Sequence, residues 1–280
     1  MALTTLAGVI SGLRAPTYTF KSGVAATAGR HMTSWYVGAI PAAATANAAG
    51  ASGAALTYPV TGSIPWAPPG SGDTVLARFL QRQNGASGSA HGSSLLIDRL
   101  WHNSGLNATL TSLQSVNSVT LPARDVAQST NGDGVLIGVE VSTAATVGTP
   151  TITVTYTNSA GTGSRIATNI AATTATSAQG SFYILSLQAG DTGVRSIQGI
   201  TLSVGWTSAV VHLVLFRVIA HMPIFGLSNG SAPSRELAKI EDVVSLAAAK
   251  IFDGSVLQIL GLATGTNTYN TALTLTLSSG

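Results

Sequence analysis

Residues 151–157 read TITVTYT, and this stretch indicates the fold class. Ile152, Val154 and Tyr156 alternate with threonines, which is the period of a strand with one buried and one solvated face. Residues 135–141 repeat the alternation after the turn-forming residues 131–134 (NGDG), and residues 158–163 predict a hairpin turn. The sequence therefore predicts short antiparallel strands.

Three further strands are predicted over residues 182–187, 200–206 and 210–219. The last is apolar on both faces, so we expect it to be a central strand. Many short strands with Gly, Asn and Ser turns and no interleaved helices are typical of an antiparallel β-sandwich. The expected fold is mainly β, with a jelly-roll-like β-sandwich over residues 91–224, an extended N-terminal arm and one C-terminal helix.

Residues 225–280 predict that helix and a β-hairpin packed on the sandwich. Ser234 is a suitable N-cap, apolar residues follow at spacings of three and four as far as Ile251, and Gly254 lies just past the predicted end. Residues 256–260 and 273–277 predict the two strands. We expect the second to leave the chain end free to join a sheet edge of a neighbouring chain.

Residues 1–90 have little regular pattern, with Ala/Gly-rich, Pro-rich and Gly/Ser-rich segments that disfavour helices and inner strands. We expect an extended arm or loop-rich region that wraps neighbouring subunits. Deleting residues 1–60 should then leave the β domain folded. The residues expected to anchor interfaces are Trp35, Tyr36, Tyr58, Trp66 and Trp101.

Charged side chains are scarce, with 13 Lys and Arg and 10 Asp and Glu, or 8 %, in 280 residues. An ordinary domain carries roughly a quarter. Because such a surface is easily desolvated against protein, we expect a homo-oligomer, with a closed trimer favoured, within a larger assembly. The basic residues are scattered singly, which predicts no nucleic-acid partner. The longest apolar stretch, residues 209–219, is too short for a membrane span.

The sequence offers no complete catalytic set. Residues 226–230 (GLSNG) match the Gly-x-Ser-x-Gly pattern, but no histidine follows His221 to serve as a base for Ser228. The chain has no cysteine, its five histidines lack metal-ligand spacing, and residues 131–134 carry a single carboxylate where a calcium loop needs several. We expect no enzymatic activity, cofactor or metal, and we interpret His212 as a core or interface imidazole.

Four segments resemble a recurrent group of tailed-bacteriophage proteins found among virion structural genes. They are residues 95–105 (LLIDRLWHNSG), 119–125 (VTLPARD), 130–143 (TNGDGVLIGVEVST) and 188–200 (QAGDTGVRSIQGI). The resemblance covers roughly residues 95–220 and implies a virion component, without a more specific role.

Together with the low surface charge, the resemblance suggests a non-enzymatic capsid decoration or cement subunit. Its partners would be copies of itself and other virion proteins such as the major capsid protein, and its location the virion, assembled in the host bacterial cytoplasm. A tail or neck component is one alternative. A carbohydrate- or receptor-binding module is another, with Trp35, Trp66, Trp101 and Trp206 as stacking platforms rather than core or interface anchors.

Overall fold

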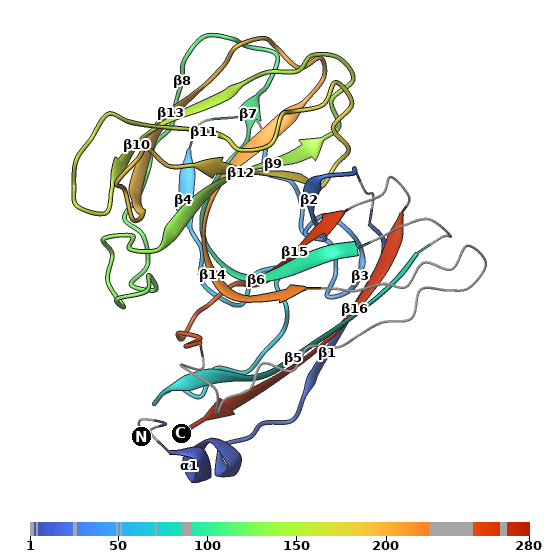
Figure 1. Ribbon diagram of the computed structural model, residues 1–280, viewed down its shortest axis with the longest axis vertical. Coiled ribbons are helices and arrows are strands. Elements are labelled where there is room, and N and C mark those ends of the chain that lie inside the picture. The colour runs from blue at the N-terminus through green and yellow to red at the C-terminus, as the bar shows by residue number, and fades with distance from the viewer. Residues whose placement is uncertain are drawn as a thin grey trace.

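The computed structural model describes residues 3, 5–24, 27–48, 50, 52–70, 72–85, 91–223, 249–263 and 268–280, and these form a mainly β protein (Figure 1). In chain order the elements are α1 (Leu6–Ser11), β1 (Thr17–Val24), β2 (Arg30–Thr33), β3 (Ala39–Ile40), β4 (Gly53–Ala55), β5 (Thr74–Gly85), β6 (His91–Asn103), β7 (Leu106–Asn107), β8 (Gln114–Ser115), β9 (Val135–Thr143), β10 (Ile152–Asn158), β11 (Arg165–Asn169), β12 (Ser181–Ser186), β13 (Val194–Leu202), β14 (Val210–Pro223), β15 (Leu257–Ala263) and β16 (Tyr269–Ser279).

Six antiparallel strands close into a barrel in the order β2-β15-β6-β14-β9-β12, with β12 pairing back to β2. Figure 1 looks into the ring that they form. The antiparallel β class is confirmed, but the expectation of a β-sandwich of jelly-roll type is wrong. Strands of a sandwich and of a barrel alternate inward and outward residues in the same way, so the sequence period does not distinguish the two.

Strand β12 also pairs with β11 and so begins a second sheet of β11, β10, β13 and β8. The largest hydrophobic core lies between this sheet and the outside of the barrel wall, where Val139 of β9 and Leu213 of β14 share one buried cluster with Val154 of β10. The predicted strands over 135–141 and 151–157 are confirmed as β9 and β10. The predicted central strand is also confirmed, because β14 lies between β6 and β9.

One end of the barrel interior is apolar. Phe182 of β12 and Phe216 of β14 meet edge to face with ring centroids 5.5 Å apart, and Val214 and Leu260 complete the buried cluster. Gly138 on β9 makes room for this packing, because a Cβ there would lie 2.2 Å from the ring of Phe182. Side chains therefore fill this end of the barrel, and it forms no channel.

A four-stranded antiparallel sheet in the order β3-β1-β16-β5 packs against the barrel. Leu275 of β16 and Phe79 of β5 contact a cluster that includes Leu96 of β6 and Leu257 of β15. The expectation of a free C-terminal strand is wrong, because β16 is paired on both sides within its own chain. The expected C-terminal hairpin is also corrected, since β15 belongs to the barrel and β16 to this other sheet.

The N-terminal 90 residues are not an extended arm. β1 pairs with β16, β4 pairs with β6, and β2 completes the barrel, so only the segment from residue 34 to residue 73 is rich in loops. Deleting residues 1–60 would remove β2, the strand that closes the barrel, so the structure argues against the prediction that such a truncation stays folded. The local pattern does not reveal β2 or the β1–β16 pairing, because β15, β12 and β16 lie more than 140 residues away in sequence.

The predicted C-terminal helix lies mostly over residues 224–248, outside the described residues. Its predicted last turn is described and is not helical, because Lys250 forms an antiparallel bridge with Val75 and Ile251 is buried in the core beneath the four-stranded sheet. The described C-terminal residues after 248 contain strands and turns but no helix.

Candidate functional site

The side of the four-stranded sheet that faces away from the barrel exposes large apolar side chains. Tyr18 and Phe20 on β1 are 65 % and 43 % exposed, and Ile40 on β3 is 59 % exposed. Phe20 is paired with Ile40, and side chains two residues apart on one strand share a face, so the three form one patch. We call this patch the outer face.

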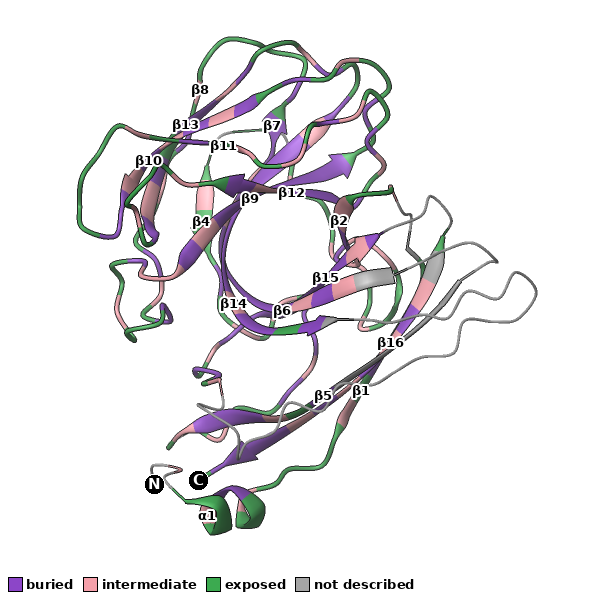
Figure 2. Ribbon diagram, viewed as in Figure 1, coloured by how far each residue is buried: buried purple, intermediate pink, exposed green. Residues whose placement is uncertain are grey.

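Helix α1 borders the outer face. On β16, Ala272 pairs with Phe20, and Ser278 lies an even number of residues further along, so both are on the side of the outer face. Ser278 Oγ donates a 2.7 Å hydrogen bond to the Val9 carbonyl of α1. The exposed apolar residues at this border are Leu6, Ile10 and Leu13. In Figure 2 most of α1 is in the exposed colour. The exposed apolar residues of α1 therefore lie beside the outer face, at the edge of the same side of the sheet.

The charges around the outer face are basic. Residues 1–72 contain no acidic residue. Arg78 on β5 is exposed and pairs with Thr276, which is on the same side of the sheet as Ala272. Arg14 is exposed between α1 and β1. This surface is suited to contact with an apolar protein surface that carries carboxylates at its edge.

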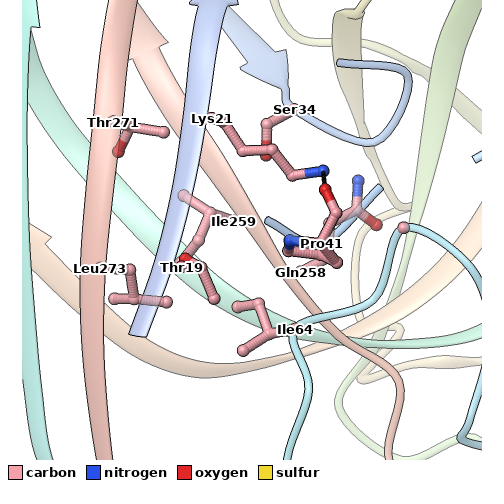
Figure 3. A pocket seen from close by; sticks show the side chains of 10 residues that line it. Thr19, Lys21, Ser34, Pro41, Ile64, Gln258, Ile259, Thr271 and Leu273 are labelled. Atoms are coloured by element: carbon pink, nitrogen blue, oxygen red, sulfur yellow. Dashed lines mark hydrogen bonds between the residues drawn. The ribbon is translucent and has the colours of Figure 1, made fainter. Parts of the chain in front are cut away.

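Lys21 points from the same strand in the opposite direction, into the space between the sheet and the barrel (Figure 3). Its ammonium group donates hydrogen bonds to the carbonyl oxygens of Val37 at 2.7 Å, Pro41 at 2.5 Å and Ala42 at 3.4 Å. The cavity beside it, about 10 Å³, has room for a single water. Burial lowers the pKa of Lys21 to about 8. Lys21 therefore fixes the loop that leads to β3 and holds Ile40 on the outer face.

Replacing Lys21 with methionine is expected to change how stability depends on pH. Because the pKa is about 8 in the folded chain and 10.5 in the unfolded chain, the unfolded chain binds more protons between these values. The free energy of unfolding should therefore rise from pH 8 to pH 9.5 by about 1–2 kcal/mol, a slope of up to about 1.4 kcal/mol per pH unit. Urea denaturation should show the rise in the original chain and its absence in Lys21→Met. Equal slopes for the two proteins would contradict the assigned pKa.

The other end of the barrel interior is polar and centres on a buried ion pair. Arg99 of β6 donates from Nη1 to Glu140 Oε1 at 3.0 Å and from Nη2 to Glu140 Oε2 at 2.8 Å, and both side chains are fully buried. The guanidinium lies 4.5 Å from the ring of Trp35. Burial alone would raise the pKa of Glu140, but the charge and hydrogen bonds of Arg99 outweigh it and hold the pKa below its usual value.

Tyr36 and His102 surround this ion pair. The Tyr36 hydroxyl donates to Glu140 Oε2 at 2.9 Å, and Arg99 Nη2 lies 3.1 Å from His102 Nδ1. Since a guanidinium can only donate, Nδ1 of His102 accepts and the ring is neutral. Burial and then the charge of Arg99 lower the pKa of His102 to about 3.

His212 and Ser142 form a second pair at this end, with Nε2 and Oγ 2.7 Å apart. His212 Nδ1 faces the carbonyl of Asn103 at 3.3 Å, so Nδ1 carries the proton. The single proton of Ser142 Oγ has two acceptors within reach, the Val210 carbonyl at 3.2 Å and His212 Nε2. The pair has the composition of a nucleophile and its base. Both side chains are nevertheless buried, Ser142 at 3 % and His212 at 1 % exposure. This matches the interpretation of His212 as a core imidazole.

The five residues predicted to anchor interfaces lie inside the chain or half-buried at its surface. Trp35, Tyr36 and Tyr58 belong to one cluster, and the rings of Tyr58 and Trp66 are 5.8 Å apart, whereas Trp101 lies in the main core. The three tryptophans are buried, so as anchors for a second chain they are corrected to core residues. Trp206 is buried as well, which contradicts the stacking-platform interpretation of all four tryptophans.

The remaining candidates for a catalytic or metal site are the Ser228 segment and the histidines and carboxylates. Ser228 and its Gly-x-Ser-x-Gly segment lie outside the described residues. Within the ranges that are described, no three His, Asp or Glu residues come together as a metal site. Helices in those same ranges lack the length and apolar character needed to cross a bilayer.

Sequence reasoning missed both the outer face and the buried cluster. Tyr18 and Phe20 alternate with Thr19 and Lys21, which is a strand signal inside a segment interpreted as an arm. Glu140 is one of the alternating residues of β9 that face the barrel interior. A buried carboxylate in an apolar strand requires a hydrogen-bonding or charged partner. The sequence does not indicate that this partner is Arg99, 41 residues away.

Comparison with known proteins gives no relative: no protein-family description, no curated protein and no solved structure matches this chain.

Proposed function

We propose that the chain is a non-enzymatic structural component of a tailed-bacteriophage virion, acting as a capsid decoration or cement subunit. The observation that carries the proposal is the outer face, where Tyr18, Phe20 and Ile40 are exposed together on one sheet. Exposed apolar patches of this kind mark contacts with other proteins. The scarcity of charge in the whole chain supports the same class of function.

The resemblance of residues 95–105 and 188–200 to phage virion proteins supports the placement in a virion. The proposed partners are further copies of the chain, as a trimer, and the major capsid protein. A tail or neck role remains the alternative that the same surface would also suit. Antibody labelling of intact virions of the phage that encodes the chain separates the two, because label on heads supports decoration and label on tails contradicts it.

The outer face should be required for assembly. Tyr18→Ser combined with Phe20→Ser removes the two aromatic side chains, and because both are exposed we expect stability to change by no more than about 0.5 kcal/mol. Binding to shells that lack the protein should fall at least tenfold in a co-sedimentation assay.

Ile170→Ser is the matched control, because Ile170 is 68 % exposed but follows β11 in a different sheet. It should bind shells like the original chain. Equal binding by the double variant and the control would show that the outer face is not the contact surface. Loss of binding by both would indicate a nonspecific apolar effect, which also contradicts the assignment.

A further inference from the structure

A second surface feature lies far from the outer face in sequence, where residues 118–121 and 130–131 meet the start of β13. These segments line a cleft of about 270 Å³, below the roughly 300–1,000 Å³ of sites for drug-sized ligands, so it suits a single small unit. Its lining has no acidic residue and one charged residue, Arg195. Three of the segments that resemble phage virion proteins contribute to it.

Arg195 is held in place without a counter-ion. Its Nη2 donates to Asn131 Oδ1 and to the Ser159 carbonyl, both at 2.8 Å. Its buried Nε has no hydrogen-bond partner. Within the described part of the chain, Nη1 has no hydrogen-bond partner either, and no carboxylate forms an ion pair with Arg195. A fixed guanidinium with an unused amino group is prepared to bind a carboxylate.

The loop that carries Asn131 is rigid. The carboxylate of Asp125 accepts hydrogen bonds from the backbone N–H groups of Ser129, Gly132 and Asp133 and from Ser129 Oγ, at 2.6–3.1 Å. Gly132 has φ +83°, and a Cβ there would lie 1.9 Å from the Val194 carbonyl, so only glycine allows the loop to approach β13 this closely. The position of Asn131 beside Arg195 therefore exists before any ligand binds.

The rest of the lining fits a ring that carries hydroxyl groups. Thr120 and Thr130 are exposed and make no hydrogen bond with the described residues, and neither does Nδ2 of Asn131. Val119, which is 37 % exposed, supplies apolar surface for the C–H groups of a sugar ring. A phosphate fits less well, because phosphate sites usually gather several cationic or backbone donors.

We propose that the cleft at Arg195 binds a carboxylate-bearing sugar, such as a uronic or sialic acid residue of a surface glycan. Arg195 pairs with the carboxylate, and Thr120, Thr130 and Asn131 bond to the ring hydroxyls. This site does not depend on the buried tryptophans, and it does not rest on the proposed role in the virion.

Titration calorimetry of the full chain with D-glucuronate and with N-acetylneuraminate tests the proposal. We expect saturable binding of at least one of the two, and Arg195→Gln should weaken it about tenfold or more, the loss of one charge-assisted hydrogen bond. Thr120→Ala should weaken it by a smaller factor without disturbing the fold, since Thr120 is exposed. Arg14→Gln is the control for general charge and should bind unchanged.

Three outcomes would overturn the proposal. Equal binding of D-glucose would show that the carboxylate is not recognised. Equal binding of acetate would show that the ring is not recognised, and preferential binding of inorganic phosphate would assign a different ligand class. If Arg195→Gln is unstable, Arg195→Lys provides the same test, because it keeps the charge but loses the two hydrogen bonds from Nη2 that position the group, so it should still bind more weakly.

Discussion

Replacing Arg99 with methionine is expected to lower the free energy of unfolding by about 3–5 kcal/mol, the usual cost of leaving one member of a buried ion pair without its partner. The substitution leaves the Glu140 carboxylate inside the barrel with the Tyr36 hydroxyl and the amide of Gln258 as its remaining donors. These neutral donors do not replace a full positive charge in a site that is completely buried. Urea denaturation at pH 7.5 measures the change.

A double variant distinguishes the ion pair from simple packing. Arg99→Met with Glu140→Leu removes both charges, so it should recover a large part of the stability lost in the single variant. Arg14→Met is the control, because Arg14 is exposed and its replacement should change stability by no more than about 0.5 kcal/mol. A double variant that is no more stable than Arg99→Met alone would contradict the importance of the pairing.

Acid should destabilise the barrel over a defined interval. The pKa values of His102, at about 3, and of His212 lie below the ordinary 6.5, chiefly because both rings are buried, and the charge of Arg99 adds to the effect. Below pH 6.5 the unfolded chain therefore binds protons that the folded chain does not bind, and stability falls as the pH falls. Each histidine contributes up to about 1.4 kcal/mol per pH unit.

Between pH 6.5 and 4.5 His102 alone should remove about 2 kcal/mol, an appreciable fraction of the 5–15 kcal/mol of a typical domain, and the lowered pKa of His212 adds to the loss. The lowered pKa of Glu140 acts in the same direction below pH 4.5, because the unfolded carboxylate takes up a proton first. Urea denaturation at half-unit steps of pH measures the slope. His102→Gln and His212→Gln should each reduce it, and the remaining slope includes the lowered pKa of His31.

These two glutamine variants also separate the histidines from the carboxylates of the chain. Each variant is first compared with the original chain at pH 7.5, where both rings are neutral, to establish its own stability. The difference between variant and original should then shrink as the pH falls, since only the original chain loses the stability of a buried neutral imidazole. A constant difference across the interval would show that these histidines do not cause the acid transition.

The strands themselves were accessible from the sequence. Ile152, Val154 and Tyr156 alternate with threonines and are buried in β10, and the apolar character of β14 on both faces corresponds to its place between β6 and β9. Side chain alternation is a local property of an extended backbone, so it can be read without knowledge of the partner strands. The antiparallel class followed from the same signals.

The four tryptophans show where sequence reasoning was least informative. Trp35, Trp66, Trp101 and Trp206 are all buried, although the sequence predicts the first three as interface anchors. An aromatic side chain fills a core or an interface equally well, so its type alone does not decide between the two. The exposed residues Tyr18 and Phe20 on β1 and Ile40 on β3 form the candidate surface instead, because they lie on the side of the sheet that faces away from the barrel.

The sequence by itself determined that the chain forms short antiparallel strands and has a weakly charged surface, because both properties depend on local pattern and composition. Only the tertiary structure decided that β2 closes a barrel, that β16 lies between β1 and β5, and that Arg99 meets Glu140 inside. These are pairings between residues far apart in the chain. Period and composition are the same whichever strand lies alongside, so pairing depends on how the whole chain buries its apolar faces and compensates its buried charges.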